Sequence, residues 1–280
     1  MSDPQHQAPV QFSGILPKVF REVQGPAARA AVVALETLGP HARVVELAVV
    51  LLEVEKSERR FTKTLETHHG FQDPHEPLSP DFTAATGIAA EMLAGKSLDL
   101  AALRAALLQA DWIIAYNAGR VRPPLQALIP ELDAKVFACA RNQIEWPAKG
   151  FACRDLRHLA FDHGWFFTGS RADIQAAALA KLLDEPDRHA GRAYLEELLS
   201  RADEPLINVE ADADPRDRHM LREEHFVWSR NKGVWERSMG PSTLRRVLAN
   251  LKSRGFDGRI MEREQLPASE RFKGSRHGKG

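Results

Sequence analysis

The sequence predicts a mixed α/β protein of two domains, a larger one followed by a smaller one. Three observations lead to this prediction: three strand-like apolar runs in succession, an alternation of helix-like and strand-like patterns after them, and a second set of elements that starts near residue 205. A chain of 280 residues has room for two domains of ordinary size. Its 44% hydrophobic and 27% charged residues are typical of globular proteins and exclude a disordered chain.

The first elements form a predicted meander of three strands. Residues 1–28 lack a sustained apolar period, so we expect a tail or a short surface helix there. Strands follow in the runs 31–36, 44–54 and 60–66, and their short connections favour antiparallel pairing. The proline- and histidine-rich stretch 67–80 has no period and is expected to be a loop.

The pattern then alternates between helices and strands. Leucines at spacings of three, four and one predict a helix at 100–108, and Trp112–Tyr116 is a short buried strand. Pro123 and Pro124 are expected in the first turn of the next helix, where a missing N–H is tolerated. The remaining elements of this domain are a strand at 135–138 and helices at 156–160 and 174–183.

A second, smaller set of elements begins at Leu206. Its predicted order is strand, helix, strand, strand, helix, strand, at 206–210, 215–221, 226–228, 234–237, 244–251 and 259–265. Asn231 and Gly233 suit the positive φ angles of a hairpin turn between the two middle strands. This order is that of a small α+β domain of the split βαβ, or ferredoxin-like, type.

The predicted domain boundaries follow these changes of pattern. They are a tail at 1–28, the first domain at 29–185, a charged linker at 186–204, a basic second domain at 205–266 and a disordered basic tail at 267–280. The two cysteines cannot form a disulfide framework, and no apolar run is long enough to span a membrane or to serve as a secretory leader. We therefore expect a cytoplasmic protein with reduced thiols and no membrane partner.

Charge is unevenly distributed although the formal net charge is zero. Residues 228–280 hold 13 Lys and Arg against 5 Asp and Glu, so a polyanion is expected to bind there. The hairpin in this region combines stacking faces with phosphate-binding charge, in Trp228, Trp235, Arg230, Lys232 and Arg237. Tryptophans this close together also commonly form the core of a small domain, and that alternative stays open.

Five blocks of the first domain occur in a distinctive order and spacing: 32–39, 45–49, 86–93, 114–118 and 150–166. On these blocks the chain resembles the DnaQ-like (DEDDh) 3′–5′ exonuclease family over about residues 30–185. Members with a C-terminal extension show an aromatic pattern similar to Phe226, Trp228 and Trp235, which extends the resemblance into the second domain. The resemblance implies a mixed sheet of the ribonuclease H-like fold.

The resemblance also identifies the positions that carry catalysis in this family. There, four carboxylates hold two Mg²⁺ ions and a histidine deprotonates the attacking water. Glu36 is the one catalytic position that this chain retains. The other four positions hold Ala34, Val121, Ser170 and Gln175.

A single glutamate does not supply the oxygen ligands that magnesium requires, so we expect no metal cofactor. The exception is a site rebuilt with another carboxylate, for which the candidates are Glu46, Asp111 and Asp173. Two further sets suggest metals but have unsuitable spacing or a loop-like context. They are Cys139, Cys153, His158 and His163, and the group His68, His69, Asp73, His75 and Glu76.

The leading interpretation is a catalytically inactive exonuclease-like protein that binds nucleic acid, single-stranded, or a nucleoprotein complex. Removing carboxylates from the groove removes repulsion for phosphate, so polar residues beside it are candidate contacts. They are Asn117, Arg120, Arg122 and Arg171, whose alternative role is that of ordinary solvated side chains. Two other functions stay open: a protein-interaction subunit of a nucleic-acid-processing assembly, and an active exonuclease that uses Mg²⁺ or Mn²⁺ in a rebuilt site.

Overall fold

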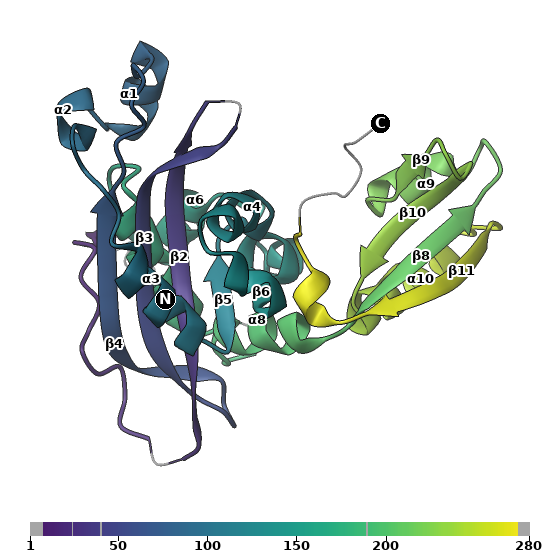
Figure 1. Ribbon diagram of the computed structural model, residues 1–280. Coiled ribbons are helices and arrows are strands. Elements are labelled where there is room, and N and C mark those ends of the chain that lie inside the picture. Colours follow the sequence, from purple (N-terminus) through teal and green to yellow (C-terminus); the bar gives the residue numbers. More distant parts are fainter. Residues whose placement is uncertain (1–7, 24, 40, 189, 274–280) are drawn as a thin grey trace. The chain divides into compact units, whose positions relative to one another are not determined.

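The computed structural model describes residues 8–273 except residues 24, 40 and 189. The chain divides into two compact units, residues 1–199 with 272–280, and residues 200–271. The first unit contains a five-stranded mixed sheet and the second a four-stranded antiparallel sheet (Figure 1). Within the described part of the chain, no helix is both long and apolar enough to cross a membrane.

The sheet of the first unit has the strand order β4-β3-β2-β5-β6. Its strands are β2 (Ala27–Leu38), β3 (Arg43–Glu55), β4 (Arg60–Phe71), β5 (Trp112–Ala115) and β6 (Val136–Cys139). The first three pair antiparallel as a meander, and β5 and β6 are parallel to β2. The predicted mixed α/β architecture is confirmed. Strand β3 is a nearly continuous apolar run because both faces of the sheet are covered.

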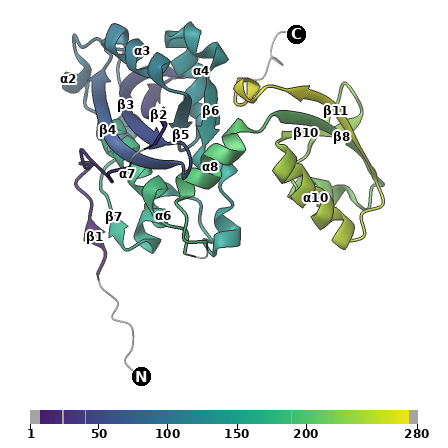
Figure 2. The same cartoon turned by 90° about the horizontal axis from the view of Figure 1, so that it is seen from below.

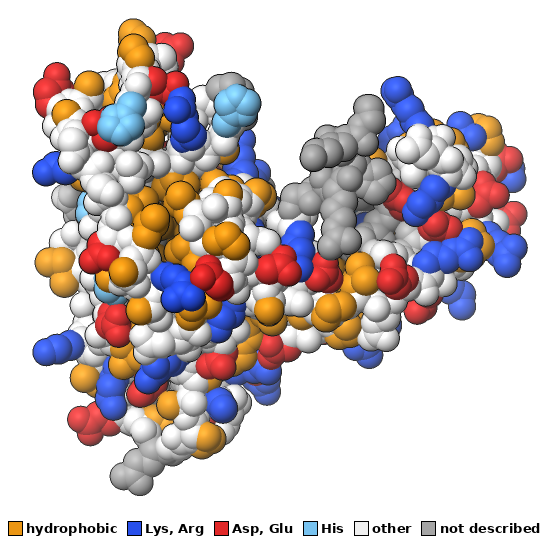
Figure 3. All heavy atoms as spheres, viewed as in Figure 1, with side chains coloured by type: hydrophobic (Ala, Val, Ile, Leu, Met, Phe, Trp, Pro, Cys, Tyr) orange, Lys and Arg blue, Asp and Glu red, His pale blue; other side chains and the backbone are white. Residues whose placement is uncertain are grey.

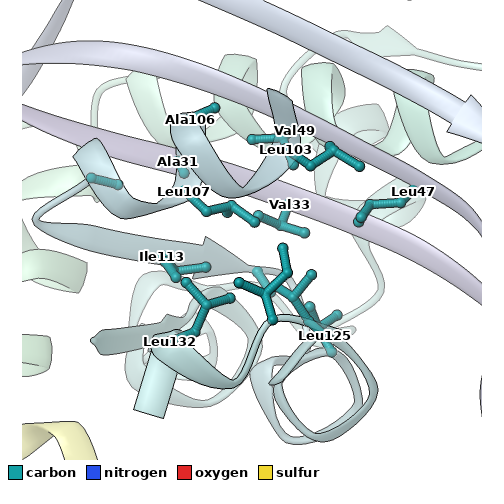
Figure 4. Close-up of a cluster of buried hydrophobic side chains, with 14 of the residues drawn as sticks. Ala31, Val33, Leu47, Val49, Leu103, Ala106, Leu107, Ile113, Leu125 and Leu132 are labelled. Atoms are coloured by element: carbon teal, nitrogen blue, oxygen red, sulfur yellow. The ribbon is translucent and has the colours of Figure 1, made fainter. Parts of the chain in front are cut away.

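Helices cover the sheet on both faces (Figure 2). On one side lie α3 (Leu100–Gln109) and α4 (Ala118–Leu128), and on the other α6 (Leu156–Asp162) and α7 (Ala172–Asp184). Alternate strand residues such as Val33 and Val49 point toward the first pair of helices and meet Leu107 and Leu125 (Figure 4). Each such leucine contributes about 1.5–3 kcal/mol by burial, which makes this layer the main core of the unit.

The shorter elements of the first unit lie around this frame. They are β1 (Val10–Gln11), α1 (Pro80–Thr86), α2 (Ala90–Leu93), α5 (Ala140–Gln143), β7 (Trp165–Phe166), α8 (Tyr194–Asp203), which continues into the second unit, and the 3-10 helices η1 (Pro130–Ala134) and η2 (Trp146–Lys149). Strand β1 pairs with β7 in parallel, so part of the predicted tail belongs to the fold. Residues 1–7 lie outside the described residues.

Two sequence-based expectations for the first unit are wrong. The predicted loop at 67–80 begins later, because β4 continues to Phe71 and pairs with β3 along its whole length. The two prolines 123 and 124 lie inside α4, which starts at Ala118 and is anchored by the buried Val121 and Leu125. The segment predicted as a charged linker holds the helix α8 in its second half, where the apolar run from Tyr194 to Leu199 favours one, and the leucines of α8 are buried.

The second unit has the predicted order of elements. They are β8 (Leu206–Asp212), α9 (Arg218–Glu223), β9 (Val227–Ser229), β10 (Val234–Met239), α10 (Pro241–Ser253) and β11 (Arg259–Leu266). The strand order is β11-β8-β10-β9, and all neighbours are antiparallel. Helix α10 lies along one face of the sheet (Figure 2), where Leu244, Val247 and Leu251 join a buried cluster with Leu221 of α9.

The predicted disorder of residues 267–280 is wrong for its first half. Residues 268–270 form the 3-10 helix η3 (Ala268–Glu270). Arg271 is buried, and its two terminal nitrogens each donate to a backbone carbonyl at 2.8 Å, those of Arg201 and Glu204. These hydrogen bonds hold the end of the second unit against its beginning. Residues 274–280 lie outside the described residues.

Candidate functional site

Two glutamates lie opposite each other on neighbouring strands, at the end of β2 and the start of β3. Glu36 pairs in register with Glu46, and directly opposed residues of an antiparallel pair emerge on the same face of the sheet. Helix α7 begins above this pair. Glu36, the one retained position of the resemblance, therefore lies beside a second acidic side chain, Glu46. The hydrogen-bond partners of the two glutamates decide what this site can do.

Glu46 is fully buried and accepts three hydrogen bonds. Its donors are His69 Nε2 at 2.8 Å, Arg171 Nε at 2.7 Å and the backbone N–H of Ala172 at 3.1 Å. Burial by itself raises the pKa of Glu46, but these donors together lower it below its ordinary value. A charged Glu46 thus holds the first turn of α7 on strand β3.

Arg171 is committed to this structural contact. Besides its bond to Glu46, its guanidinium lies 4.7 Å from the ring centroid of Phe71. The predicted role of Arg171 as a phosphate contact is therefore not supported, because its charge is already matched by a buried carboxylate.

Glu36 faces an amide instead. Gln175 Nε2 donates to Glu36 Oε1 at 2.9 Å and to the backbone carbonyl of Ser170 at 2.6 Å. Burial, and to a smaller degree the charge of Glu46, raises the pKa of Glu36 above its ordinary value, while the Gln175 hydrogen bond opposes this rise. The side chain that meets Glu36 presents a nitrogen donor, which cannot ligate a cation.

The remaining catalytic positions offer no metal ligand of the required kind. Ala34 has only a methyl group, and Val121 is buried in the core beside Leu125. The Ser170 hydroxyl accepts a hydrogen bond from Arg157 Nη2 at 2.7 Å. The residues present therefore do not fit a pair of divalent ions.

Within the described residues, one group of His, Cys, Asp and Glu is compact enough to be tested as a metal site. It consists of Glu46, His69 and Asp173, whose ligand atoms lie within 4.8 Å of one another. An ion there would displace the hydrogen bonds of Glu46 and lie beside the guanidinium of Arg171. Asp173 Oδ1 is buried and has no hydrogen-bond partner among the residues that the structure describes, but its place in the first turn of α7 already favours negative charge. The group does not fit a divalent cation well.

The other predicted metal candidates are not gathered. Asp111 accepts the N–H of Arg29 at 2.9 Å near the start of β2 and β5, at the opposite end of the sheet from Glu36. His163 is bonded to the carbonyl of Leu159 and to the Tyr194 hydroxyl. Burial raises the pKa of the Cys139 thiol, so it is not a ready thiolate ligand.

The backbone of three arginines lies near the carboxyl ends of β5 and β6. Arg120 N–H donates to the Asn117 carbonyl at 3.0 Å and Arg141 N–H to the Tyr116 carbonyl at 2.9 Å, and the Tyr116 hydroxyl donates to the carbonyl of Arg154. We call Arg120, Arg141 and Arg154 the arginine edge. None of the three has an ion-pair partner in the part of the chain that the structure describes, and Arg120 and Arg141 are exposed.

The arginine edge and Glu36 lie at the same end of the sheet, since β2 and β5 are parallel with Val33 opposite Ala115. Ligands of open α/β sheets commonly bind at the carboxyl ends of parallel strands. Sequence reasoning identified Asn117 and Arg120 but missed Arg141 and Arg154. The available signal was that Arg141 comes three residues after the end of the predicted strand at 135–138.

The structure contradicts the predicted role of Arg122 as a nucleic-acid contact. Arg122 is fully buried, donates to Gln126 at 3.0 Å and to the carbonyl of Asp133 at 2.8 Å, and covers the Phe137 ring. Arg120 and Arg122 flank Val121, and the sequence suggested that both are exposed. Because a helix turns by about 100° per residue, their side chains point to different sides of α4. Arg122 cannot reach a phosphate.

The hairpin of the second unit holds the two tryptophans opposite each other on β9 and β10. Trp235 is 5% exposed and belongs to the core, so its predicted stacking role is wrong; the open alternative of a core residue holds for it. Trp228 is 42% exposed and packs edge-on against Trp235 with ring centroids 5.7 Å apart. One of the two indoles is thus accessible.

Two of the three cations predicted beside these tryptophans are neutralised. Lys232 Nζ lies 3.3 Å from Glu210 and 3.0 Å from Glu236. Arg237 donates to the carbonyl of Glu224 and is half-buried against its carboxylate. Arg230 is exposed in the hairpin turn. Lys232 and Arg237 thus have acidic partners already, and their predicted phosphate-binding role stays a prediction.

The second unit is also close to neutral as a whole. Residues 200–271 contain 14 Lys and Arg and 13 Asp and Glu, because the acidic stretch before residue 228 belongs to the same unit. Side chains of both signs are interspersed over it on the face seen in Figure 3. The predicted domain at 205–266 has an excess of only two positive charges, 12 Lys and Arg against 10 Asp and Glu, so attraction for a polyanion must come from local groups.

No protein-family model and no curated protein matches the chain. Among solved structures, it is similar to a 3′-exonuclease in 3′-end specific recognition of histone mRNA stem-loop, at 13% identity over 60% of this chain and 70% of that one, with a TM-score of 0.42. It is also similar to exonuclease X in complex with 5′ overhanging duplex DNA, at 19% identity over 60% of this chain and 99% of that one, with a TM-score of 0.39. A third similar structure is E. coli exonuclease I in complex with a dA16 oligonucleotide, at 14% identity over 81% of this chain and 70% of that one, with a TM-score of 0.44. All three are exonucleases, but similarities of this size assign neither a family nor an activity to this chain.

Proposed function

We propose that this protein is an exonuclease-like protein that binds single-stranded nucleic acid, alone or in a nucleoprotein complex, without cutting it. The observation that carries the proposal is the hydrogen bond from Gln175 to Glu36. The resemblance assigns both positions to metal-ligating carboxylates, and here an amide N–H occupies the space between them. The raised pKa of Glu36 supports the same conclusion, because a readily protonated carboxyl is a poor ligand for Mg²⁺.

Binding is assigned to the arginine edge, with Asn117 beside it. Arg120 and Arg141 are exposed cations without acidic partners in the described residues, at the end of the sheet where Glu36 lies. Each phosphate contact adds about 0.7 to the slope of log affinity against log salt on a single strand. Contacts by three arginines therefore predict a slope of about 2.

The second unit is proposed to be a ferredoxin-like domain. Its strand order β11-β8-β10-β9 and the packing of both helices into one buried cluster support this assignment. A cytoplasmic location stays a prediction from the sequence.

The test is a binding titration of the full chain with a fluorescently labelled oligothymidylate at several salt concentrations. Arg120→Glu combined with Arg141→Glu is expected to weaken binding at least tenfold and to flatten the salt slope by more than 1. Lys56→Glu is the matched control, because Lys56 is exposed in the turn after β3, at the other end of the sheet. Equal losses in the control and the double variant would contradict the assignment to the arginine edge.

Activity is measured on the same oligonucleotide with a 3′ label, in Mg²⁺ and in Mn²⁺. No release of nucleotides is expected. Release that Glu36→Gln abolishes would establish the alternative of an active exonuclease with a rebuilt site.

A protein-interaction subunit is the second candidate, and exposed apolar side chains in the first unit favour it. Val10 is 64%, Ile15 77% and Phe161 58% exposed. Single exposed apolar residues are common, so this observation is weaker than the arginine edge. Absence of oligothymidylate binding at low salt would make this second candidate the better one.

A further inference from the structure

An exposed tryptophan and two arginines form a cluster at one edge of the second unit. Strand β9 is the edge strand of the sheet, and α9 lies next to it (Figure 1). Arg218 Cζ is 5.9 Å from the ring centroid of Trp228, and Arg222 Cζ is 5.3 Å from that of Trp235. We call Trp228, Trp235, Arg218 and Arg222 the Trp–Arg cluster.

The charges of the two arginines are not compensated by their own helix. Glu223 of α9 pairs with Arg254 at 2.7 Å, and Glu224 is approached by Arg237 and Arg246 at 3.8 and 3.6 Å. In the described part of the chain, neither arginine of the cluster has an ion-pair partner. The cluster is therefore a local excess of positive charge on a unit that is nearly neutral.

Two N–H donors in the cluster have no acceptor. Arg218 Nε and Trp235 Nε1 are buried and lack a hydrogen-bond partner within the described residues. Buried donors in folded proteins are nearly always hydrogen-bonded. Arg218 and Arg222 are cations, and their guanidinium groups select an anionic ligand with oxygen acceptors.

The opposite face of the sheet offers no comparable site. The ion pairs of that face join Glu210 to both Lys232 and Arg263, and Lys232 also to Glu236. Among the accessible surfaces of this unit, the Trp–Arg cluster joins an open aromatic face to unpaired cations.

We propose that the Trp–Arg cluster binds one nucleotide of a single-stranded nucleic acid, with the base stacked on Trp228 and the phosphate held by Arg218 and Arg222. The inference rests on the proposed function and adds a second contact site to it. Stacking on an aromatic side chain is tolerant of base identity, so the contact is expected to be independent of sequence. The neighbouring Trp235 keeps the indole of Trp228 in place from behind.

The test compares three single variants of the full chain in the oligothymidylate titration. Trp228→Ala and Arg218→Gln are each expected to weaken binding by about five- to tenfold, and Arg218→Gln to lower the salt slope by about 0.7. Arg259→Gln is the matched control, because Arg259 is an exposed arginine on β11, the opposite edge strand of the same sheet. It is expected to change affinity less than twofold. Tryptophan fluorescence of the wild type is expected to fall on binding, and less so in Trp228→Ala.

The outcomes separate the cluster from the proposed function. If the wild type binds and both cluster variants behave like Arg259→Gln, the cluster has another role while the proposed function stands. If the wild type does not bind oligothymidylate at low salt, the proposed function is overturned and the nucleotide site with it. Because Trp228 packs on Trp235, Trp228→Phe is included: it keeps the packing and a stacking face, and is expected to recover most of the affinity.

Discussion

Glu36 and Glu46 face each other across two strands, yet their surroundings differ. Glu46 is buried and accepts hydrogen bonds from a guanidinium, an imidazole and the first turn of a helix, whereas Glu36 receives an amide N–H from Gln175. Burial raises the pKa of both, but only Glu46 has enough donors to reverse the effect. The comparison teaches that the hydrogen-bond donors around a carboxylate, more than the extent of its burial, decide whether its charged form stabilises the fold.

The largest effect on stability is expected from removing the charge of Glu46, which accepts hydrogen bonds from Arg171 and the start of α7. Glu46→Gln removes the charge that Arg171 and the start of α7 require, and is expected to lower the free energy of unfolding by about 3 kcal/mol. Urea denaturation measures this value. Glu36→Gln is the matched control and should change it by less than about 1 kcal/mol. Similar losses for both variants would show that the two glutamates are equivalent.

A second experiment introduces carboxylates beside Glu36 so that the site can hold a metal ion. Ala34→Asp together with Gln175→Asp places three carboxylates together, so we expect a loss of about 1–2 kcal/mol in EDTA from their mutual repulsion. Mn²⁺ should recover it and raise the Tm by several degrees. The wild-type Tm is expected to differ by less than about 1 °C between EDTA and Mn²⁺. A wild-type rise as large as that of the double variant would mean that Glu46, His69 and Asp173 hold the ion instead.

The smallest effect concerns pH. Because the folded-state pKa of Glu46 is lowered, its contribution to stability is present above its ordinary value of 4.5 and is lost as the pH falls through the lower folded value. Glu36 has a raised pKa, so ionising it costs stability as the pH rises above 4.5, and Glu36→Gln removes that cost. Denaturation curves between acid and neutral pH should show Glu36→Gln slightly more stable than the wild type at neutral pH, and the difference should vanish in acid. A difference that grows in acid would contradict this assignment.

Much of the fold could be predicted because its signals are local. The stripe of Leu244, Val247 and Leu251 predicted α10, and those residues are buried as expected. The three apolar runs predicted the meander. The end of β4 could not be predicted, since His68 and His69 look like loop residues until β3 is placed beside them.

The candidate site could be predicted less well. The motif spacing located Glu36 and Gln175, and the structure places the two side chains in contact. Arg122 and Trp235 were expected at a surface and are buried, because sequence reasoning does not show which side of a helix or hairpin the rest of the chain covers. Arg141 and Arg154 were missed because they are distant from Tyr116 in the sequence. The parallel pairing of β5 with β6 and the path of the loop before α6 bring their backbone next to Tyr116.

The sequence by itself determined the mixed α/β class and the order of the elements, because side-chain periodicity is a property of short segments. Only the tertiary structure decided which charges are free. Glu46 binds Arg171 across 125 residues, and Glu210 binds Arg263 across 53. Charge pairing over such separations depends on how strands and helices are packed, and among the described residues it leaves the arginine edge and the two arginines of the Trp–Arg cluster without ion-pair partners.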